Sequence, residues 1–127
     1  MTTNSPRLVT IVDDDESVRE SLPDLLRRLG YAVDAFSGAQ QFLSDGQIDE
    51  TWCLILDIAM PGMTGPQLQA ELIRLGKRIP IIFISAYDDE RLHMLLKERG
   101  AVACLLKPFS EVALVEALGR VSHGDLP

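Results

Sequence analysis

Cysteine, histidine and aromatic residues are scarce in this chain of 127 residues. It contains two cysteines, two histidines and 6% aromatic residues. No group of cysteines and histidines has the spacing of a zinc site, which argues against a structural metal of that kind. Cys53 and Cys104 each lie within an apolar run. We therefore expect two buried thiols in a reducing compartment and no disulfide.

A long apolar run and a surplus of positive charge are also missing. No run approaches the roughly 20 residues that cross a bilayer, and residues 1–7 lack a signal-peptide core. We therefore expect a cytoplasmic protein with no membrane partner. The formal net charge is −7, and the sequence has neither a basic stripe nor a helix-turn-helix pattern. These features predict no direct nucleic-acid binding by this chain.

Five short apolar runs alternate with segments of helical periodicity, and the length suits one domain. We expect this domain to span residues 1–127, with its core at about 8–121 and a tail or the start of a linker at 122–127. The apolar runs are Leu8–Val12, Ala32–Phe36, Cys53–Leu56, Ile81–Ile84 and Ala103–Leu106. The last three are almost continuously apolar, which predicts strands covered on both faces, whereas Asp34 places the second nearer an edge.

The segments between the runs predict helices with one apolar face each. Ser37 is the expected N-cap of the second helix, Pro66 lies in the first turn of the third, and Asp88 or Asp89 caps the fourth. The apolar residues assigned to these faces include Leu29, Leu75, Leu92, Leu95, Leu96 and Val115. Strict alternation of strands and helices predicts an α/β fold, a (βα)5 doubly wound sheet of five parallel strands. The expected strand order is 2-1-3-4-5, the flavodoxin-like arrangement.

Acidic residues gather where two of the expected strands end. Asp13, Asp14 and Asp15 follow the first strand, and Asp57 ends the third. In this sheet order the carboxyl ends of those two strands are neighbours and form the ligand crevice. Two unit charges about 4 Å apart repel by about 4 kcal/mol at an effective dielectric constant of about 20. The cluster therefore keeps a proton or binds a cation, and its all-oxygen ligands suit Mg²⁺.

The same acidic residues also fit a simpler interpretation. Acidic side chains at strand ends are often solvated loop residues or helix caps. Asp15 fits that alternative best, because a carboxylate is favoured at the start of a helix.

Two further polar residues end strands on the same side of the expected sheet. Lys107 follows the fifth strand and Ser85 ends the fourth. A lysine can place a compact positive charge beside a phosphoryl group, and a serine hydroxyl can donate a hydrogen bond to one. Each residue alone reads as a solvated strand end. The expected position of Lys107 and Ser85 beside three carboxylates indicates phosphoryl transfer, a reaction that depends on positioning and charge neutralisation.

Four stretches of the chain together resemble the receiver domain of two-component response regulators. These stretches are Ile11–Asp15, Leu56–Gly65, Ile84–Ala86 and Leu106–Phe109, and the similarity covers about residues 8–121. The sequences at Asp14–Arg19 and Ala101–Ala103 are most similar to the FixJ-type subfamily, whose members usually carry a C-terminal DNA-binding domain. The resemblance implies a sensor histidine kinase as partner, and a homodimer that forms on phosphorylation.

The resemblance also implies a role for each candidate residue. Asp57 would be the phosphoacceptor, and Lys107 and Ser85 would contact the phosphoryl group. The Lys107–Pro108 bond would be cis, which would point the lysine into the crevice. The Mg²⁺ ligands would be Asp13 through a water, Asp14, Asp57 and the carbonyl oxygen of Ala59. Such a protein would not be an enzyme acting on an external substrate, although it would slowly hydrolyse its own acyl phosphate.

The sequence departs from the family at three positions. Cys104 stands where the family usually has Tyr or Phe, so we expect the signal to pass through the loop after Ser85 and the helix that follows it. Ala59 cannot orient a water and Tyr87 is bulky enough to shield the site, which predicts a long-lived acyl phosphate. His93 and His123 are expected at the surface.

Other functions remain open on the sequence alone. A phosphate-independent interaction module or a single-domain phosphate shuttle would have the same fold. An α/β phosphohydrolase would share the nucleophilic aspartate, but it would need an Asp-x-Asp pattern after the first strand. A flavin-binding protein would need a phosphate-cradling loop where Asp13–Asp15 stand.

Overall fold

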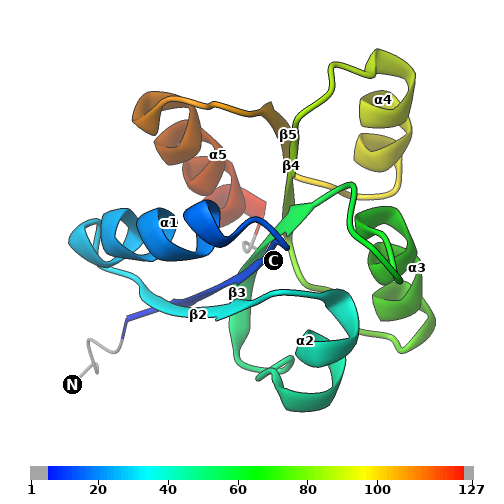
Figure 1. Cartoon of the computed structure of the whole chain (residues 1–127), viewed down its shortest axis with the longest axis horizontal. Coiled ribbons are helices and arrows are strands. Elements are labelled where there is room, and N and C mark those ends of the chain that lie inside the picture. Colours follow the sequence, from blue (N-terminus) through cyan, green and yellow to red (C-terminus); the bar gives the residue numbers. More distant parts are fainter. Residues whose placement is uncertain (1–5, 125–127) are drawn as a thin grey trace.

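Five strands and five helices alternate along residues 6–124, the part of the chain that the computed structural model describes (Figure 1). The strands are β1 (Leu8–Val12), β2 (Ala32–Phe36), β3 (Thr51–Asp57), β4 (Ile81–Ser85) and β5 (Ala103–Leu106). The helices are α1 (Glu16–Arg28), α2 (Ala39–Asp45), α3 (Gly65–Arg74), α4 (Glu90–Glu98) and α5 (Glu111–Gly124). All strand pairs are parallel, in the order β2-β1-β3-β4-β5. This confirms the doubly wound, flavodoxin-like fold.

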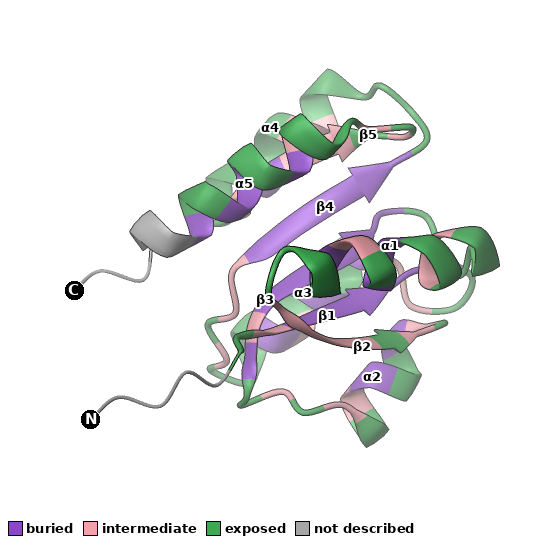
Figure 2. Ribbon diagram, turned by 90° about the vertical axis from the view of Figure 1, so that its left-hand side faces the viewer, coloured by how far each residue is buried: buried purple, intermediate pink, exposed green. Residues whose placement is uncertain are grey.

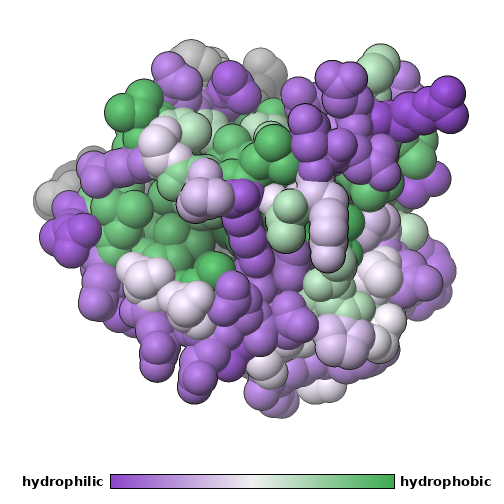
Figure 3. All heavy atoms as spheres, turned by 45° about the horizontal axis from the view of Figure 1, so that its top comes forward, coloured by the Kyte–Doolittle hydropathy of each residue, from purple (hydrophilic) through white to green (hydrophobic). Residues whose placement is uncertain are grey.

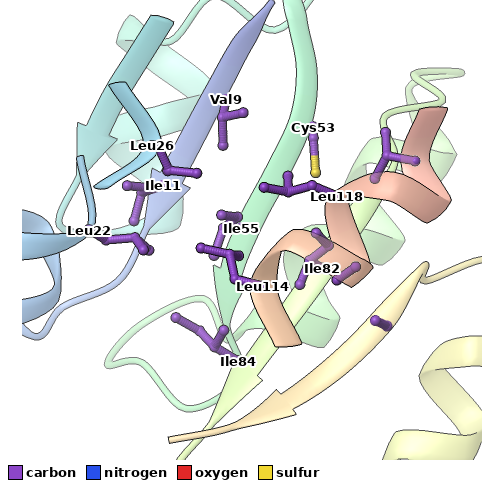
Figure 4. Close-up of a cluster of buried hydrophobic side chains, with 13 residues drawn as sticks. Val9, Ile11, Leu22, Leu26, Cys53, Ile55, Ile82, Ile84, Leu114 and Leu118 are labelled. Atoms are coloured by element: carbon purple, nitrogen blue, oxygen red, sulfur yellow. The ribbon is translucent and has the colours of Figure 1, made fainter. Parts of the chain in front are cut away.

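The inner strands send alternate side chains into two apolar layers, as the two-residue period of a strand requires. One layer packs Val9, Ile11 and Ile55 against α1 and α5 (Figure 4). The other packs Leu54, Leu56 and residues of the neighbouring strands against α2, α3 and α4. Figure 2 shows β4 buried along its length, in contrast to the helices, whose outer faces are exposed.

The two edge strands differ from the inner ones. No residue of β2 is fully buried, which confirms the edge position that Asp34 indicated. β5 is the opposite edge, and the prediction that it is covered on both faces was wrong, because Leu106 is 40% exposed. An apolar run cannot distinguish an inner strand from an edge strand whose side chains lie partly under a helix.

Helix ends follow local hydrogen bonds that only partly agree with the predicted caps. Thr64 caps α3 through a capping box with Gln67, so this helix begins one residue before Pro66. Asp89 caps α4 by accepting a hydrogen bond from Leu92. The prediction for α2 was wrong. Gly38 is its N-cap, and the backbone N–H of Ser37 instead donates to the side chain of Gln41.

Several apolar helix residues lie further from the core than periodicity predicted. Leu96 is fully buried, whereas Leu95 is 40% exposed and Val115 is 44% exposed. Leu29 and Leu75, at the ends of α1 and α3, are also exposed. A run of adjacent leucines contains the buried face without showing which members form it, so periodicity marks the helix but not its exact orientation.

The two cysteines occupy different layers of the fold. Cys53 is fully buried under α1 and α5, whereas Cys104 packs at the edge of the other layer and is half-buried. They therefore do not pair with each other. α5 continues to Gly124, so residues 122–124 are helical, whereas the side chain of His123 and residues 125–127 lie outside the described residues. Within the described range, no helix has the length and apolar character needed to traverse a bilayer.

Gly65 sets how closely α3 approaches the end of β3. A Cβ at this position would collide with the carbonyl oxygen of Asp57 and would lie 3.0 Å from Cα of Ile58. We predict that Gly65→Ala displaces the β3–α3 loop and lowers the free energy of unfolding by about 1–3 kcal/mol, as overpacking does. Urea denaturation measures this change.

The matched control is Gly119→Ala, in the exposed part of α5. A Cβ there meets nothing within 4 Å. The same substitution should therefore raise the free energy of unfolding by about 0.5–1 kcal/mol, because alanine favours a helix more than glycine does. If Gly65→Ala were as stable as the wild type, the close approach at the end of β3 would not constrain the loop.

Candidate functional site

Three aspartates converge at the carboxyl ends of β1 and β3. Each of Asp13, Asp14 and Asp57 offers a carboxylate oxygen, and these oxygens lie within 4.8 Å of one another. Asp13 and Asp57 are buried, with exposures of 0% and 5%, whereas Asp14 is exposed. The convergence arises because β1 and β3 are neighbours in the sheet. Their last paired residues are Val12 and Leu56, so the aspartates that come next in each segment lie at the same edge. This confirms that the predicted crevice brings the acidic residues together.

The position of Asp13 is fixed by the backbone around it. Its Oδ1 accepts a hydrogen bond of 2.9 Å from the backbone N–H of Asp15. Its carbonyl oxygen accepts one of 2.9 Å from the guanidinium of Arg19, which reaches back from the first turns of α1. Arg19 was not singled out from the sequence. A basic residue six positions after an acidic one gives no signal until the turn between strand and helix is known.

Asp15 does not belong to this cluster and caps α1. Its carboxylate accepts hydrogen bonds from the backbone N–H and the hydroxyl of Ser17, and these bonds lower its pKa. The helix-cap interpretation is therefore correct for Asp15, while Asp13 and Asp14 belong to the site.

Lys107 is the cation of the cluster. Its ammonium lies 2.9 Å from Oδ2 of Asp13 and 3.9 Å from Oδ1 of Asp57. The Lys107–Pro108 peptide bond is cis, as the family resemblance implied, and the side chain points into the crevice. The approach to Asp13 lacks hydrogen-bond geometry, so Oδ2 of Asp13 is a buried oxygen with an ionic contact and no hydrogen-bond partner among the described residues.

Burial and charge together set the protonation of the site. Burial, followed by repulsion from Asp13, raises the pKa of Asp57 to about 7, although Lys107 opposes the change. Burial lowers the pKa of Lys107, but the neighbouring carboxylates outweigh burial and raise it overall. One ammonium thus faces two buried carboxylates and an exposed third. The surplus negative charge favours a bound cation at neutral pH.

The donor set fits Mg²⁺ in particular. Carboxylates are hard oxygen ligands, and few of them are needed because Mg²⁺ keeps several waters. The buried Oδ2 of Asp13, which lacks a hydrogen-bond partner, is an acceptor that a metal-bound water could satisfy. Ala59 is exposed on the loop that follows β3, and its carbonyl as a further ligand stays a prediction.

Ser85 reaches the same rim but its hydroxyl is turned away from the aspartates. The residue is 4% exposed, and its Oγ donates to the carbonyl oxygen of Tyr87 at 2.8 Å and accepts from the Tyr87 N–H at 3.0 Å. The hydroxyl must leave this local ring before it can contact a phosphoryl group. Tyr87 is 71% exposed, and shielding of the site by its ring stays a prediction.

His93 of α4 and Cys104 of β5 are neighbours. The prediction of a surface histidine was wrong for His93, whose Nε2 is buried and has no hydrogen-bond partner among the described residues. The thiol of Cys104 lies 3.9 Å from the carbonyl oxygen of His93. Burial raises the pKa of Cys104, which keeps the thiol protonated and unreactive. This environment argues against a redox sensor at that position.

Comparison with known proteins gives one consistent family. The family model described as "Response regulator receiver domain" matches residues 9–119. The chain is 40% identical over 118 residues to Nodulation protein W of Bradyrhizobium diazoefficiens, covering 93% of this chain and 52% of that protein. It is 42% identical over 111 residues to the response regulator TodT of Pseudomonas putida, covering 87% of this chain and 49% of that protein. The chain thus spans about half the length of these curated relatives.

Solved structures agree with the sequence relatives. The response regulator StyR is 41% identical, with a TM-score of 0.85, over 93% of this chain and 60% of that chain. The FixJ-N crystal structure is 32% identical, with a TM-score of 0.83, over 100% of this chain and 99% of that chain. The similarity to FixJ-N, which covers the whole chain, includes the strand ends that carry the aspartates.

The raised pKa of Asp57 predicts a pH-dependent stability when no divalent ion is present. A folded-state pKa of about 7, above the ordinary 3.8, means that ionising Asp57 costs stability as pH rises between those values. At pH 8 with EDTA, we predict that Asp57→Asn is more stable than the wild type by about 1–3 kcal/mol, and that the difference shrinks towards pH 5. Urea denaturation at both pH values measures it.

Asp45→Asn is the control, since it removes an exposed carboxylate at the end of α2. It should change stability little at either pH. Mg²⁺ should stabilise the wild type at pH 8 and leave Asp57→Asn nearly unaffected. A wild type that is as stable as Asp57→Asn at pH 8 without metal would contradict the electrostatic picture.

Proposed function

This chain belongs to the response regulator receiver domain family, and from that premise we propose that Asp57 accepts a phosphoryl group from a sensor histidine kinase in a Mg²⁺-dependent reaction. Receiver domains are signalling components of two-component systems, and the family binds Mg²⁺ at an acidic pocket. The observation that carries the assignment to this residue is the convergence of Asp13, Asp14 and Asp57 with Lys107 in one crevice. The acyl phosphate on Asp57 is the signalling state.

The transfer uses the carboxylate of Asp57 as nucleophile. One of its oxygens forms a bond to phosphorus while the bond between phosphorus and the kinase imidazole breaks, and the imidazole nitrogen keeps the electron pair. Asp13, Asp14, Asp57 and the Ala59 carbonyl would hold Mg²⁺, which neutralises charge on the phosphoryl oxygens. A bound cation also keeps Asp57 ionised at neutral pH, because an opposite charge lowers the pKa of a carboxyl group.

Lys107 and Ser85 complete the contacts to the phosphoryl group. Lys107 already lies 3.9 Å from Asp57 and needs only to exchange its contact with Asp13 for a phosphoryl oxygen. Ser85 must give up its hydrogen bonds to the backbone of Tyr87. That exchange moves the loop between β4 and α4, which is the route we propose for the signal because Cys104 lacks an aromatic ring.

The surface around α4, β5 and α5 is the proposed output face. Hydrophobic residues come to the surface of this protein in patches bordered by hydrophilic ones (Figure 3). The large hydrophobic residues exposed on this face and on the loop before it are Tyr87, Met94, Leu95, Leu106, Val112 and Val115. Phosphorylation would favour a homodimer through this face. DNA binding would belong to a C-terminal domain of a longer protein, with residues 1–127 acting as one cytoplasmic domain.

Intact-mass spectrometry after incubation with acetyl phosphate tests the acceptor. We expect the wild type to gain the mass of one phosphoryl group with Mg²⁺ present and none with EDTA. Asp57→Asn should gain nothing, because an amide cannot act as the nucleophile. Asp45→Asn should behave like the wild type. A phosphoryl adduct on Asp57→Asn equal to that of the wild type would contradict the assignment.

Sedimentation velocity with and without acetyl phosphate and Mg²⁺ tests the output face. We expect the phosphorylated chain to dimerise, and Val112→Glu to weaken dimerisation at least about tenfold, because a buried unpaired charge is costly. Val112 is 67% exposed on α5. Ile73→Glu is the control, since Ile73 is 56% exposed but lies on α3. Equal weakening by both variants would place the dimer contact elsewhere.

A further inference from the structure

A groove of about 590 Å³ opens at the end of the sheet opposite Asp57. Its floor is formed at the amino end of β4 and just before β5. Its sides come from α3, the connection between α3 and β4, the residues just after α4, and the C-terminal part of α5. Apolar side chains line much of it, among them Leu72, Ile73, Ile79, Val102 and Val121. Its size lies in the range of small-molecule sites, which are mostly apolar with a few placed polar groups.

The charged residues that line this groove are all positive. Lys77, Arg78 and Arg99 belong to the lining, and no acidic residue does. This is unusual for a chain with 19 acidic residues, 12 basic residues and a net charge of −7. The ammonium of Lys77 pairs with Asp49 at 2.7 Å. Among the described residues, neither Arg78 nor Arg99 makes an ion pair or a side-chain hydrogen bond, so both guanidinium groups remain available to an anion.

Gln69 places a polar side-chain amide in the otherwise apolar wall of the groove. It belongs to α3 and is only 3% exposed. Its Nε2 makes a long hydrogen bond of 3.5 Å to the carbonyl oxygen of Leu96 in α4, and its Oε1 has no hydrogen-bond partner among the described residues. A buried acceptor without a partner is costly, so a donor on a molecule seated beside it would be favoured.

We propose that this groove binds a small organic anion, a carboxylate or sulfonate attached to an apolar aromatic body. The apolar walls would take the aromatic body, and Arg78 and Arg99 would take the acidic group through charge-assisted hydrogen bonds. The site uses none of the residues around Asp57. It is therefore independent of the phosphoryl chemistry and does not depend on the proposed function.

The probe for the test is 8-anilinonaphthalene-1-sulfonate, an aromatic anion with one N–H donor. We expect its fluorescence to rise with saturable one-to-one binding to the folded chain. In ¹⁵N-labelled protein, the amide shifts should cluster at residues 69–81 and 99–102, around the groove. The shift map is needed because this dye also binds apolar surface in partly folded proteins. Binding that does not saturate, or shifts centred on α4, β5 and the exposed face of α5, would overturn the proposal.

Charge is tested on the ligand and on the protein separately. The uncharged analogue N-phenylnaphthalen-1-amine should bind the wild type at least about tenfold more weakly than the sulfonate, and equal affinity would overturn the anion assignment. The double variant Arg78→Gln/Arg99→Gln should bind the sulfonate more weakly than the wild type, by a similar factor. Arg28→Gln/Arg91→Gln is the matched control, because it removes the same charge from exposed positions outside the groove and should bind normally. Equal affinities of the two double variants would also overturn the proposal.

Discussion

Two carboxylates buried side by side under one lysine are the constraint around which this protein is organised. A parallel sheet of order β2-β1-β3-β4-β5 makes β1 and β3 neighbours, so the residues at their carboxyl ends lie close together. Asp13 and Asp57 are both nearly inaccessible to water, and Lys107 is the one described residue that forms an ion pair with them. The apoprotein therefore holds a site whose electrostatic strain is relieved by a cation or a proton. The same strain makes the site responsive to whatever binds there.

The proposed route for that response is the neighbouring backbone. The hydroxyl of Ser85 is held in a small ring of hydrogen bonds with Tyr87, directly before the loop that leads to α4. Lys107 is tied to the same strand end, since its backbone N–H donates to the carbonyl oxygen of Ser85 at 2.7 Å. A change at Asp57 that attracts the lysine and the serine thus acts on two adjacent strand ends at once. Residues 86–89, in the loop before α4, are all exposed, so few buried contacts oppose a movement of this loop.

Sequence reasoning predicted the fold and the meeting of the acidic residues because both follow from strand order alone. Parallel strands separated by single helices have few arrangements, and residues at strand ends inherit their positions from that order. Details that depend on side-chain direction were not predictable in the same way. The burial of Nε2 of His93, the exposure of Leu95 and the hydrogen bond from Arg19 to Asp13 each depend on the rotation of a helix by part of a turn. The groove lined by Arg78 and Arg99 needs segments that are adjacent only after folding.

The direction of α5 has a consequence for any polypeptide that continues beyond it. α5 runs back along the sheet from Glu111 to Gly124, so Val121 lies beside the amino end of β4 rather than beside Asp57. At about 1.5 Å per residue the helix covers roughly 20 Å. Over such a span, a surface charge in physiological salt is largely screened, since the Debye length is about 8 Å. A tethered module attached there would not sense the field of a new anion at Asp57. Such a module would have to respond to a movement of the packed helices, such as a change in their tilt.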